Sequence, residues 1–196
     1  IDFVDKIKGV KHISGMYFRA GEISFRDQRK YIFVIGMDSR TDMDFLEETF
    51  TVGIGKGRHL KRGELSKVTL GHNYQFDDII LKKGIKLGDK VKINDKYFDV
   101  VGFWEEIGNP QDDSNVYVTD GHYNDLNPDD NSYDQIWVRV DVTDIDKVVR
   151  AIEKNLRKSR NLEEGKEDFT VDSFNDLIND CSITKKYHSY NIKMTA

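Results

Sequence analysis

The segment Val91-Lys-Ile-Asn-Asp-Lys-Tyr-Phe-Asp-Val-Val-Gly-Phe103 constrains the fold more than any other part of the chain. Before Asn94-Asp95 two apolar residues alternate with lysines, and after it Phe98 and Val100 continue the alternation. Because successive side chains of a strand point to opposite faces, this period of two predicts two strands that each turn one face to a core. Asn and Asp tolerate the positive φ that a two-residue loop needs. We therefore predict a β-hairpin here.

Two long extended segments are predicted before the hairpin. Val10 to Phe25 is the first, and Gly15 and Gly21 suggest bulges or bends within it. Tyr31 to Ile35 is a continuous apolar run, which predicts a strand buried on both faces. Shorter elements are predicted as helices over residues 2–8, 43–49 and 76–83, and as strands over residues 68–70 and 116–118.

The C-terminal third predicts a strand, a helix and a second strand. Residues 135–142 alternate apolar side chains inward, and residues 169–171 form the later strand. Between them Asp144 and Asp146 suit the positive end of a helix, in which Glu153 and Arg157 lie one turn apart. The predicted apolar stripe of this helix is Ile145, Val148, Val149, Ile152 and Leu156. A further helix is predicted after Ser173, and no periodicity is evident beyond Ile183.

The order of these elements predicts an α+β fold with two lobes. Residues 1–50 and 132–180 are assigned to one strand-helix lobe built from both chain ends. Residues 51–131 are assigned to an inserted, mostly β second lobe. Residues 181–196 are expected to form a loosely ordered tail.

Several short motifs follow one another at suitable intervals. They are Gly57-Arg58, Val68-Thr-Leu-Gly71, Leu87-Gly88-Asp89, Phe98-Asp-Val-Val-Gly102 and Val116-Tyr-Val118, flanked by Gly9-Val10 and by residues 135–171. This ordered set resembles the extracytoplasmic core domain of the MacB/LolC/FtsX-type ABC transporter permeases. The resemblance covers most of the chain, to about Phe174.

The resemblance implies a mechanical role on the outer side of the cell membrane and no enzymatic chemistry or cofactor. It implies a split βαβ, porter-like lobe next to the membrane, with a transmembrane helix before Ile1 and three more after the C-terminal end. ATP hydrolysis is expected on a separate cytoplasmic ATPase subunit, and the full-length permease is expected to be a homo- or heterodimer. The isolated domain is expected to be a monomer or a weak dimer. The substrate stays open, as does the choice between export, lipid extraction and regulation of a hydrolase.

The composition excludes some classes of function but identifies none. Of 196 residues 33% are charged, the net charge is −5 and both signs are interspersed, so no basic surface indicates nucleic-acid binding. No apolar run approaches the ~20 residues of a membrane span. The chain begins at Ile1 rather than at methionine, which suggests that it was cut from a longer protein. Cys181 is the only cysteine, so no disulfide within the chain is possible.

Two motifs invite a ligand-binding interpretation, and neither fits well. Gly53-Ile-Gly-Lys-Gly-Arg58 lacks the spacing of a phosphate loop, and we interpret Gly53, Gly55 and Gly57 as a hinge between the lobes. Asp125 to Asn131 alternates like the start of a calcium loop but lacks the glycine and the glutamate that such a loop needs. The five histidines show no spacing typical of a metal site, so no metal is expected.

The segment after the hairpin carries the remaining candidates. Glu105-Glu106 beside Trp104 could supply a general acid, but the sequence places no second carboxylate near it. Phe103, Trp104 and Ile107 are either core residues or a contact surface for a partner or substrate. A secreted small hydrolase and a stand-alone glycan- or ligand-binding module are therefore the alternatives to a permease domain.

Overall fold

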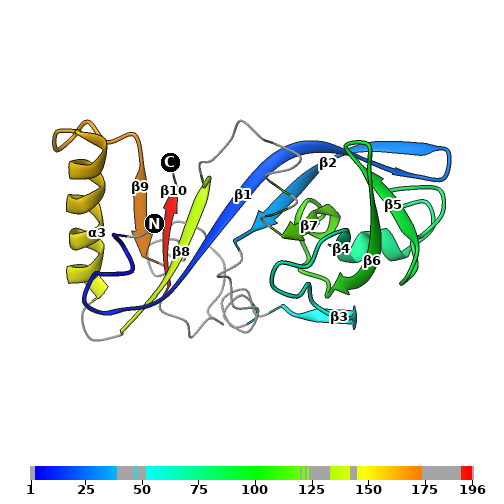
Figure 1. The fold of residues 1–196 in the computed structure, drawn as a ribbon, viewed down its shortest axis with the longest axis horizontal. Coiled ribbons are helices and arrows are strands. Elements are labelled where there is room, and N and C mark those ends of the chain that lie inside the picture. The colour runs from blue at the N-terminus through cyan, green and yellow to red at the C-terminus, as the bar shows by residue number, and fades with distance from the viewer. Residues whose placement is uncertain are drawn as a thin grey trace. The chain divides into compact units, whose positions relative to one another are not determined.

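The computed structural model describes residues 3–38, 47, 52–119, 121, 123, 133–141, 145–173 and, for the backbone, 191–195. The chain divides into two compact units, which are described in turn (Figure 1). Unit 1 comprises residues 1–16, 40–42 and 133–196, and unit 2 comprises residues 17–39 and 43–132. In the described residues the architecture is mixed and rich in sheet, with one α-helix.

Unit 2 is built from strands that close on one another. Along the sheet the order is β2-β7-β4-β6-β5-β1, and β1 also pairs with β2, which completes a closed cycle of six strands. β3 pairs with β6 outside this cycle. The elements are β1 (Val10–Phe25), β2 (Gln28–Met37), β3 (Ile54–Gly57), β4 (Lys67–Leu70), η1 (His72–Gln75), β5 (Lys90–Ile93), β6 (Lys96–Trp104), η2 (Asp112–Ser114) and β7 (Val116–Thr119).

The predicted hairpin is confirmed as β5 and β6. The strands are antiparallel, with Val91 opposite Phe98. Asn94 and Asp95 have φ values of 42° and 69°. Two consecutive positive φ values define the type I′ turn, whose twist matches that of the flanking strands. Asn94 Oδ1 also accepts a hydrogen bond of 2.8 Å from the backbone N of Glu22, which ties the turn to β1.

The closed cycle gives each strand an inside and an outside, which corrects the prediction for β2. Residues 31–35 were expected to be buried on both faces, yet Tyr31 is 88% and Phe33 43% exposed. Val34 and Ile35 are buried. The rings of Tyr31 and Phe33, in the first part of the strand, face water, and the apolar run in the sequence gives no sign of this. The side chains that are buried on the strands of unit 2 include Ile23, Val34, Val68, Leu70, Val91, Ile93, Phe98, Val100, Val116 and Val118.

Gly15 and Gly21 of β1 were predicted to mark bulges or bends, but in the structure they permit close contacts with other side chains. A Cβ at Gly15 would lie 2.3 Å from Cε1 of Tyr133, and a Cβ at Gly21 would lie 2.8 Å from Cγ2 of Val34. The irregularity in the pairing of β1 with β8 occurs instead between Val10 and His12. Gly15 and Gly21 are therefore sites where a side chain crosses the strand closely.

Unit 1 contains the first part of β1, followed in the sheet by β8 (Gln135–Val140), β10 (Asn191–Thr195) and β9 (Thr170–Ser173). Helix α3 (Ile145–Arg160) lies beside β9 (Figure 1). The predicted stripe of α3 is confirmed, since Val148 and Ile152 are buried and its other members are partly buried. The core around them consists of Val4, Ile13, Val138, Val140, Val148 and Ile152.

The tail prediction is corrected for residues 191–195. These residues form β10, which is antiparallel to both β8 and β9 and lies between them. The alternation in Asn191-Ile-Lys-Met-Thr195 is too short to identify a strand by itself, and the strands that pair with it lie far away in the sequence.

The end of α3 is connected to the loop that follows it. Arg157 on α3 forms an ion pair of 2.7 Å with Glu167 in this loop.

Two predicted short helices are also corrected. Residues 3–9 form turns closed by bonds such as that of 3.0 Å from Ile7 N to Val4 O, and Gly9 has φ +100°. Residues 76–83 form turns in which Asp77 accepts hydrogen bonds from Gly84 N and from Lys83. An aspartate that bonds to nearby donors favours a turn over a helix.

The boundary between the units differs from the predicted one. Residues 17–38 belong to unit 2, because β1 and β2 pair with β5 and β7. The predicted helices over residues 43–49 and after Ser173, the calcium-like segment and most of the linker over residues 124–134 lie outside the described residues.

Candidate functional site

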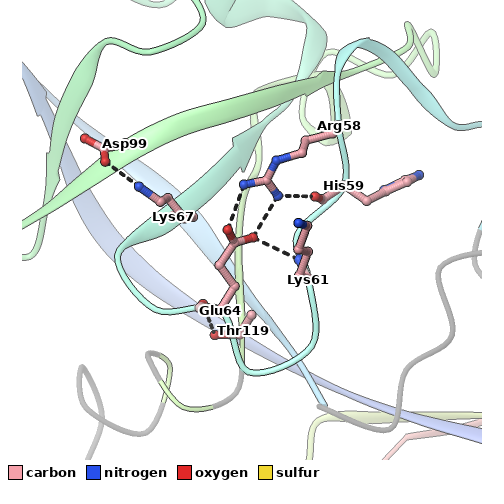
Figure 2. A network of polar contacts seen from close by, with 7 residues as sticks. All are labelled: Arg58, His59, Lys61, Glu64, Lys67, Asp99 and Thr119. Carbon is pink, nitrogen blue, oxygen red and sulfur yellow. Dashed lines mark hydrogen bonds and ion pairs between the residues drawn. The ribbon is translucent and has the colours of Figure 1, made fainter.

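A network of polar contacts fixes the loop between β3 and β4 (Figure 2). The Arg58 guanidinium donates to both carboxylate oxygens of Glu64, at 2.8 Å and 2.7 Å. Arg58 Nη1 also donates to the backbone O of His59, at 2.9 Å. A bidentate arginine–carboxylate pair is directional as well as charged, so it fixes the loop more firmly than a single contact would.

Glu64 connects this loop to two further backbone segments. Its carboxylate accepts a bond of 3.0 Å from the backbone N of Lys61, and its backbone O accepts one of 3.0 Å from Thr119 Oγ1 at the end of β7. Hydrogen bonding from Arg58 is the main reason that the pKa of Glu64 is lowered to about 2. The carboxylate is thus ionised and engaged at both oxygens, which indicates a structural role.

A second ion pair lies at the start of β4. Lys67 Nζ donates to Asp99 Oδ2 at 2.6 Å, and Lys90 Nζ lies 3.6 Å from Asp99 Oδ1. The hydrogen bond from Lys67 is the first cause of the lowered pKa of Asp99. These three residues face one another across β4, β6 and β5, since Asp99 is opposite both Lys67 and Lys90.

The glycines in the family-like motifs are explained by close backbone contacts. Gly57 has φ +89°, and a Cβ there would lie 2.3 Å from the backbone O of Val101. A Cβ at Gly102 would lie 2.3 Å from the backbone O of Arg58, and one at Gly71 2.3 Å from that of Asp113. Any side chain at these positions would force the backbone apart. The glycines of the motifs that carry the resemblance are therefore required by the fold. Because they serve the backbone and not a ligand, these motifs do not indicate a substrate.

Two of the three predicted contact residues are buried. Phe103 is fully buried and Trp104 is 5% exposed, so neither can meet a partner in this conformation. Trp104 Nε1 donates to Thr69 Oγ1 at 3.1 Å, which satisfies the polar atom that its burial would otherwise leave unpaired. Ile107 is 40% exposed and remains accessible.

The loop that carries Ile107 is held by a buried aspartate. Asp113 is 4% exposed and accepts hydrogen bonds from the backbone N atoms of Ile107 and Gly108, at 2.7 Å and 3.1 Å. No pattern in the sequence identifies Asp113 or Glu64 as a structural residue. Neither lies in a spacing that identifies its partner, because each binds loop amides whose position depends on the fold.

The predicted hinge residues and the candidate acid lie side by side. Gly55 and Gly57 are part of β3, which pairs with β6, and Gly53 precedes it within unit 2. Glu105 exchanges bonds with Gly53: its backbone N donates to Gly53 O at 2.9 Å, and Gly53 N donates to Glu105 Oε2 at 3.3 Å. This arrangement extends the pairing of β3, and both Glu105 and Glu106 are exposed. The hinge role of the glycines stays a prediction.

No group of three metal-binding side chains that could hold an ion occurs within the described ranges. Among the histidines, His59 contacts the carboxylate of Glu47 through Nε2, and its ring meets that of Trp104 edge-on at 5.4 Å. In the described part of the chain no helix is long and apolar enough to cross a membrane.

The fold is shared with extracytoplasmic domains of ABC-type transporters. The extracellular domain of the noncanonic ABC-type transporter YknZ from Gram-positive bacteria matches with a TM-score of 0.66 and 16% identity, covering 83% of each chain. The periplasmic region of MacB from Actinobacillus actinomycetemcomitans matches with a TM-score of 0.66 and 14% identity, covering 83% of this chain and 73% of that one. At these identities the likeness shows the fold alone.

The sequence profile of the MacB-like periplasmic core domain matches residues 1–155, and the chain belongs to this family of ABC transporter permease domains. An uncharacterized ABC transporter permease of Methanocaldococcus jannaschii is 29% identical over 173 residues, which are 87% of this chain. The chain spans 41% of the length of that relative.

Proposed function

We propose that this chain is the extracytoplasmic domain of an ABC transporter permease and that it couples ATP-driven motion of membrane helices to events outside the membrane. The observation that carries the proposal is the family match over residues 1–155. Those events are export or extraction of a substrate, or signalling to an outside partner. The domain itself contributes no catalysis and binds no cofactor.

The two-unit organisation supports this proposal. Residues 1–16 and 133–196 both belong to unit 1, so we assign unit 1 as the porter-like, split βαβ lobe next to the membrane. Unit 2 is the inserted lobe. β1 pairs with β8 in unit 1 and with β5 in unit 2, and this continuous strand is suited to transmit a displacement from one unit to the other. Bending at Gly53, Gly55 and Gly57 is a second proposed source of motion.

The assembly follows from the same family membership. We propose that the full-length permease works as a dimer with an ABC ATPase on the cytoplasmic side, and that the membrane part supplies most of the association. The isolated chain is then a monomer or a weak dimer. Light scattering at micromolar concentration tests this, and a dimer that survives dilution would place the assembly interface in this domain.

Topology is the direct test of the proposal. In the full-length permease, with Cys181 and any cysteine outside this chain replaced by serine, a single cysteine at Leu65 should react with a membrane-impermeant maleimide in intact cells. Leu65 is suitable because it is 58% exposed. Labelling only after the cells are broken would contradict an extracytoplasmic position.

Coupling needs a separate measurement. Replacing residues 17–132 by a short flexible linker removes unit 2 together with residues 40–42 of unit 1. In proteoliposomes that contain the permease and its ATPase, we expect ATP hydrolysis to continue and the transport or signalling output to be lost. An unchanged output would exclude a coupling role for unit 2.

A further inference from the structure

Strand β1 belongs to both units, because the boundary between them falls between Met16 and Tyr17 within the strand. Before this boundary β1 pairs with β8 as far as Met16, and beyond it β1 pairs with β2 and β5. Gly15 lies two residues before Tyr17. Glycine weakens a strand, because it has no side chain to pack and loses more conformational freedom than other residues. The strand therefore needs support from other residues where it passes from one unit to the next.

On the unit 1 side, the ring of Tyr133 occupies the space of the missing side chain. A Cβ at Gly15 would lie 2.3 Å, 2.4 Å and 2.9 Å from three ring atoms of Tyr133. The backbone N of the next residue, Asp134, donates a hydrogen bond of 3.0 Å to Met16 O. An aromatic ring over a glycine compensates for the packing that the glycine lacks. Tyr133 and Asp134 thus support β1 up to its last residue in unit 1.

On the unit 2 side, Tyr123 supports the strand. Its ring stacks on that of Tyr17, with 4.4 Å between the centroids and 19° between the planes. It also packs on a glycine of β2, since a Cβ at Gly36 would lie 2.5 Å from Cγ of Tyr123. Tyr123 is fully buried and Tyr17 is 5% exposed. Stacked aromatic pairs stabilise a structure beyond the area that they bury, so the first residue of β1 in unit 2 is held firmly.

The two tyrosines have related places in the chain. Tyr123 and Tyr133 stand on either side of residues 124–132, which lead from unit 2 back to unit 1. Each tyrosine contacts β1 within its own unit, Tyr133 at Gly15 and Tyr123 at Tyr17. Both contacts therefore fall within two residues of the boundary in β1. They are called the two braces below.

We propose that the two braces keep β1 extended and hydrogen-bonded through its passage from unit 1 to unit 2, so that the strand acts as a lever between the units. Tyr133 and Tyr123 are positioning residues in this device. A strand that stays intact passes a displacement along its backbone, whereas a strand that opens locally at a glycine absorbs it. The braces follow from the packing within each unit, and their use as part of a lever rests on the proposed function.

Hydrogen exchange of the isolated chain, followed by mass spectrometry, tests the braces. In the wild-type protein, peptides that contain Met16 and Tyr17 should exchange as slowly as peptides from the rest of β1. Tyr133→Ala should speed the exchange of these peptides about tenfold or more, because local opening is no longer opposed by the ring.

Gly15→Ala is the more discriminating variant. By strand propensity and chain entropy alone, alanine should stabilise this position and slow the exchange. Its Cβ would, however, displace the ring of Tyr133. We therefore expect exchange to become faster, and the double variant Gly15→Ala with Tyr133→Ala should exchange no faster than either single variant, because both remove the same contact.

Tyr97→Ala is the matched control, because Tyr97 is a tyrosine of unit 2 that is 67% exposed. It should leave the exchange of β1 unchanged. Tyr123→Leu should speed exchange at the crossing from the unit 2 side, and near-UV circular dichroism should show that it folds. Because Tyr123 is fully buried, the result rests on Gly15→Ala if this variant does not fold.

Two outcomes would overturn the braces. Fast exchange of the peptides with Met16 and Tyr17 in the wild-type protein would show that β1 is already open at the crossing. Unchanged or slower exchange in Gly15→Ala would show that the ring of Tyr133 does not support the strand.

The lever is tested separately in proteoliposomes that contain the full-length permease and its ATPase. Gly15→Ala should lower the transport or signalling output while ATP hydrolysis continues. Faster exchange with an unchanged output would reject the lever. Cysteine labelling at Leu65 tests the proposed function independently, since cytoplasmic labelling would reject the permease position and leave the exchange results of the isolated chain unaffected.

Discussion

Unit 2 and unit 1 enclose their cores in different ways. In unit 2 six strands close in a cycle, so that one side of each strand faces the core and the other faces water. In unit 1 the sheet of β1, β8, β10 and β9 packs against α3 through a smaller cluster that includes Val138, Val148 and Ile152. A sheet that closes on itself can therefore bury its core without helices, whereas an open sheet depends on the element that covers it.

The chain carries a natural reporter for each unit, because Trp104 lies in unit 2 and Trp137 in unit 1. Both side chains are buried. In a Trp137→Phe background fluorescence follows unit 2, and in a Trp104→Phe background it follows unit 1. These two backgrounds separate the stability of unit 2 from that of unit 1.

The largest effect is expected in the core of unit 2. Phe98 is 1% exposed, and Phe98→Ala should lower the free energy of unfolding by about 3–5 kcal/mol because it leaves a cavity. Urea titration followed by Trp104 fluorescence measures this. Tyr97→Ala is the control one residue away, and it should change stability by no more than about 0.5 kcal/mol. Equal effects of the two variants would mean that the cycle of strands does not separate inside from outside.

A somewhat smaller effect is expected where α3 covers the sheet of unit 1. Ile152 is fully buried, and Ile152→Ala should cost about 2–4 kcal/mol as reported by Trp137. The exposed Lys154→Ala serves as the control on the same helix. We expect the Trp137 transition to shift more than the Trp104 transition. Equal shifts of both would show that the two units unfold as one.

The Arg58–Glu64 network should make unit 2 sensitive to acid. Since the pKa of Glu64 is lowered to about 2 in the folded state, its stabilisation is complete above the unfolded pKa of about 4.3 and is lost as the pH falls towards 2. Arg58 is 41% exposed, and water screens the pair, so we expect Glu64→Gln to cost only about 1–2 kcal/mol at pH 7.

The difference between the wild-type protein and Glu64→Gln should shrink between pH 5 and pH 2, as measured by urea titration with the Trp104 reporter. Glu106→Gln, at an exposed carboxylate, should show no such dependence. A difference that is constant over this range would assign the effect of Glu64 to packing rather than to charge.

The smallest effect is expected at an exposed ion pair of unit 1. Arg160 Nη2 lies 2.6 Å from Asp168 Oδ2, and the two side chains are 41% and 52% exposed. Water and salt screen such a pair, so Asp168→Asn should leave the Trp137 transition unchanged within error. A clear loss of stability would mean that this loop contributes to covering the sheet.

Sequence alone determined the elements whose signals are local. The β5–β6 hairpin was predictable because its alternation and the residues of its turn, Asn94 and Asp95, lie within one short segment. Helix α3 was predictable because its apolar stripe repeats over several turns. The full extent of β1 followed from the same kind of local pattern.

The exposed side of each strand and the contacts between distant groups could not be predicted from the sequence, because both depend on how the sheet closes. Tyr31 belongs to an apolar run, yet it faces water because β1 closes onto β2. The sequence left open whether Phe103 and Trp104 are core residues or contact residues, and the structure buries both as core residues of β6. β10 forms between β8 and β9, although the sequence of residues 191–195 alone gives little indication of a strand.

The contacts of Glu64 with Arg58 and Thr119 likewise depend on where β3 and β7 end. The physical reason is that burial and hydrogen bonding between distant segments are set by the closure of the sheet, which no local pattern of residues encodes.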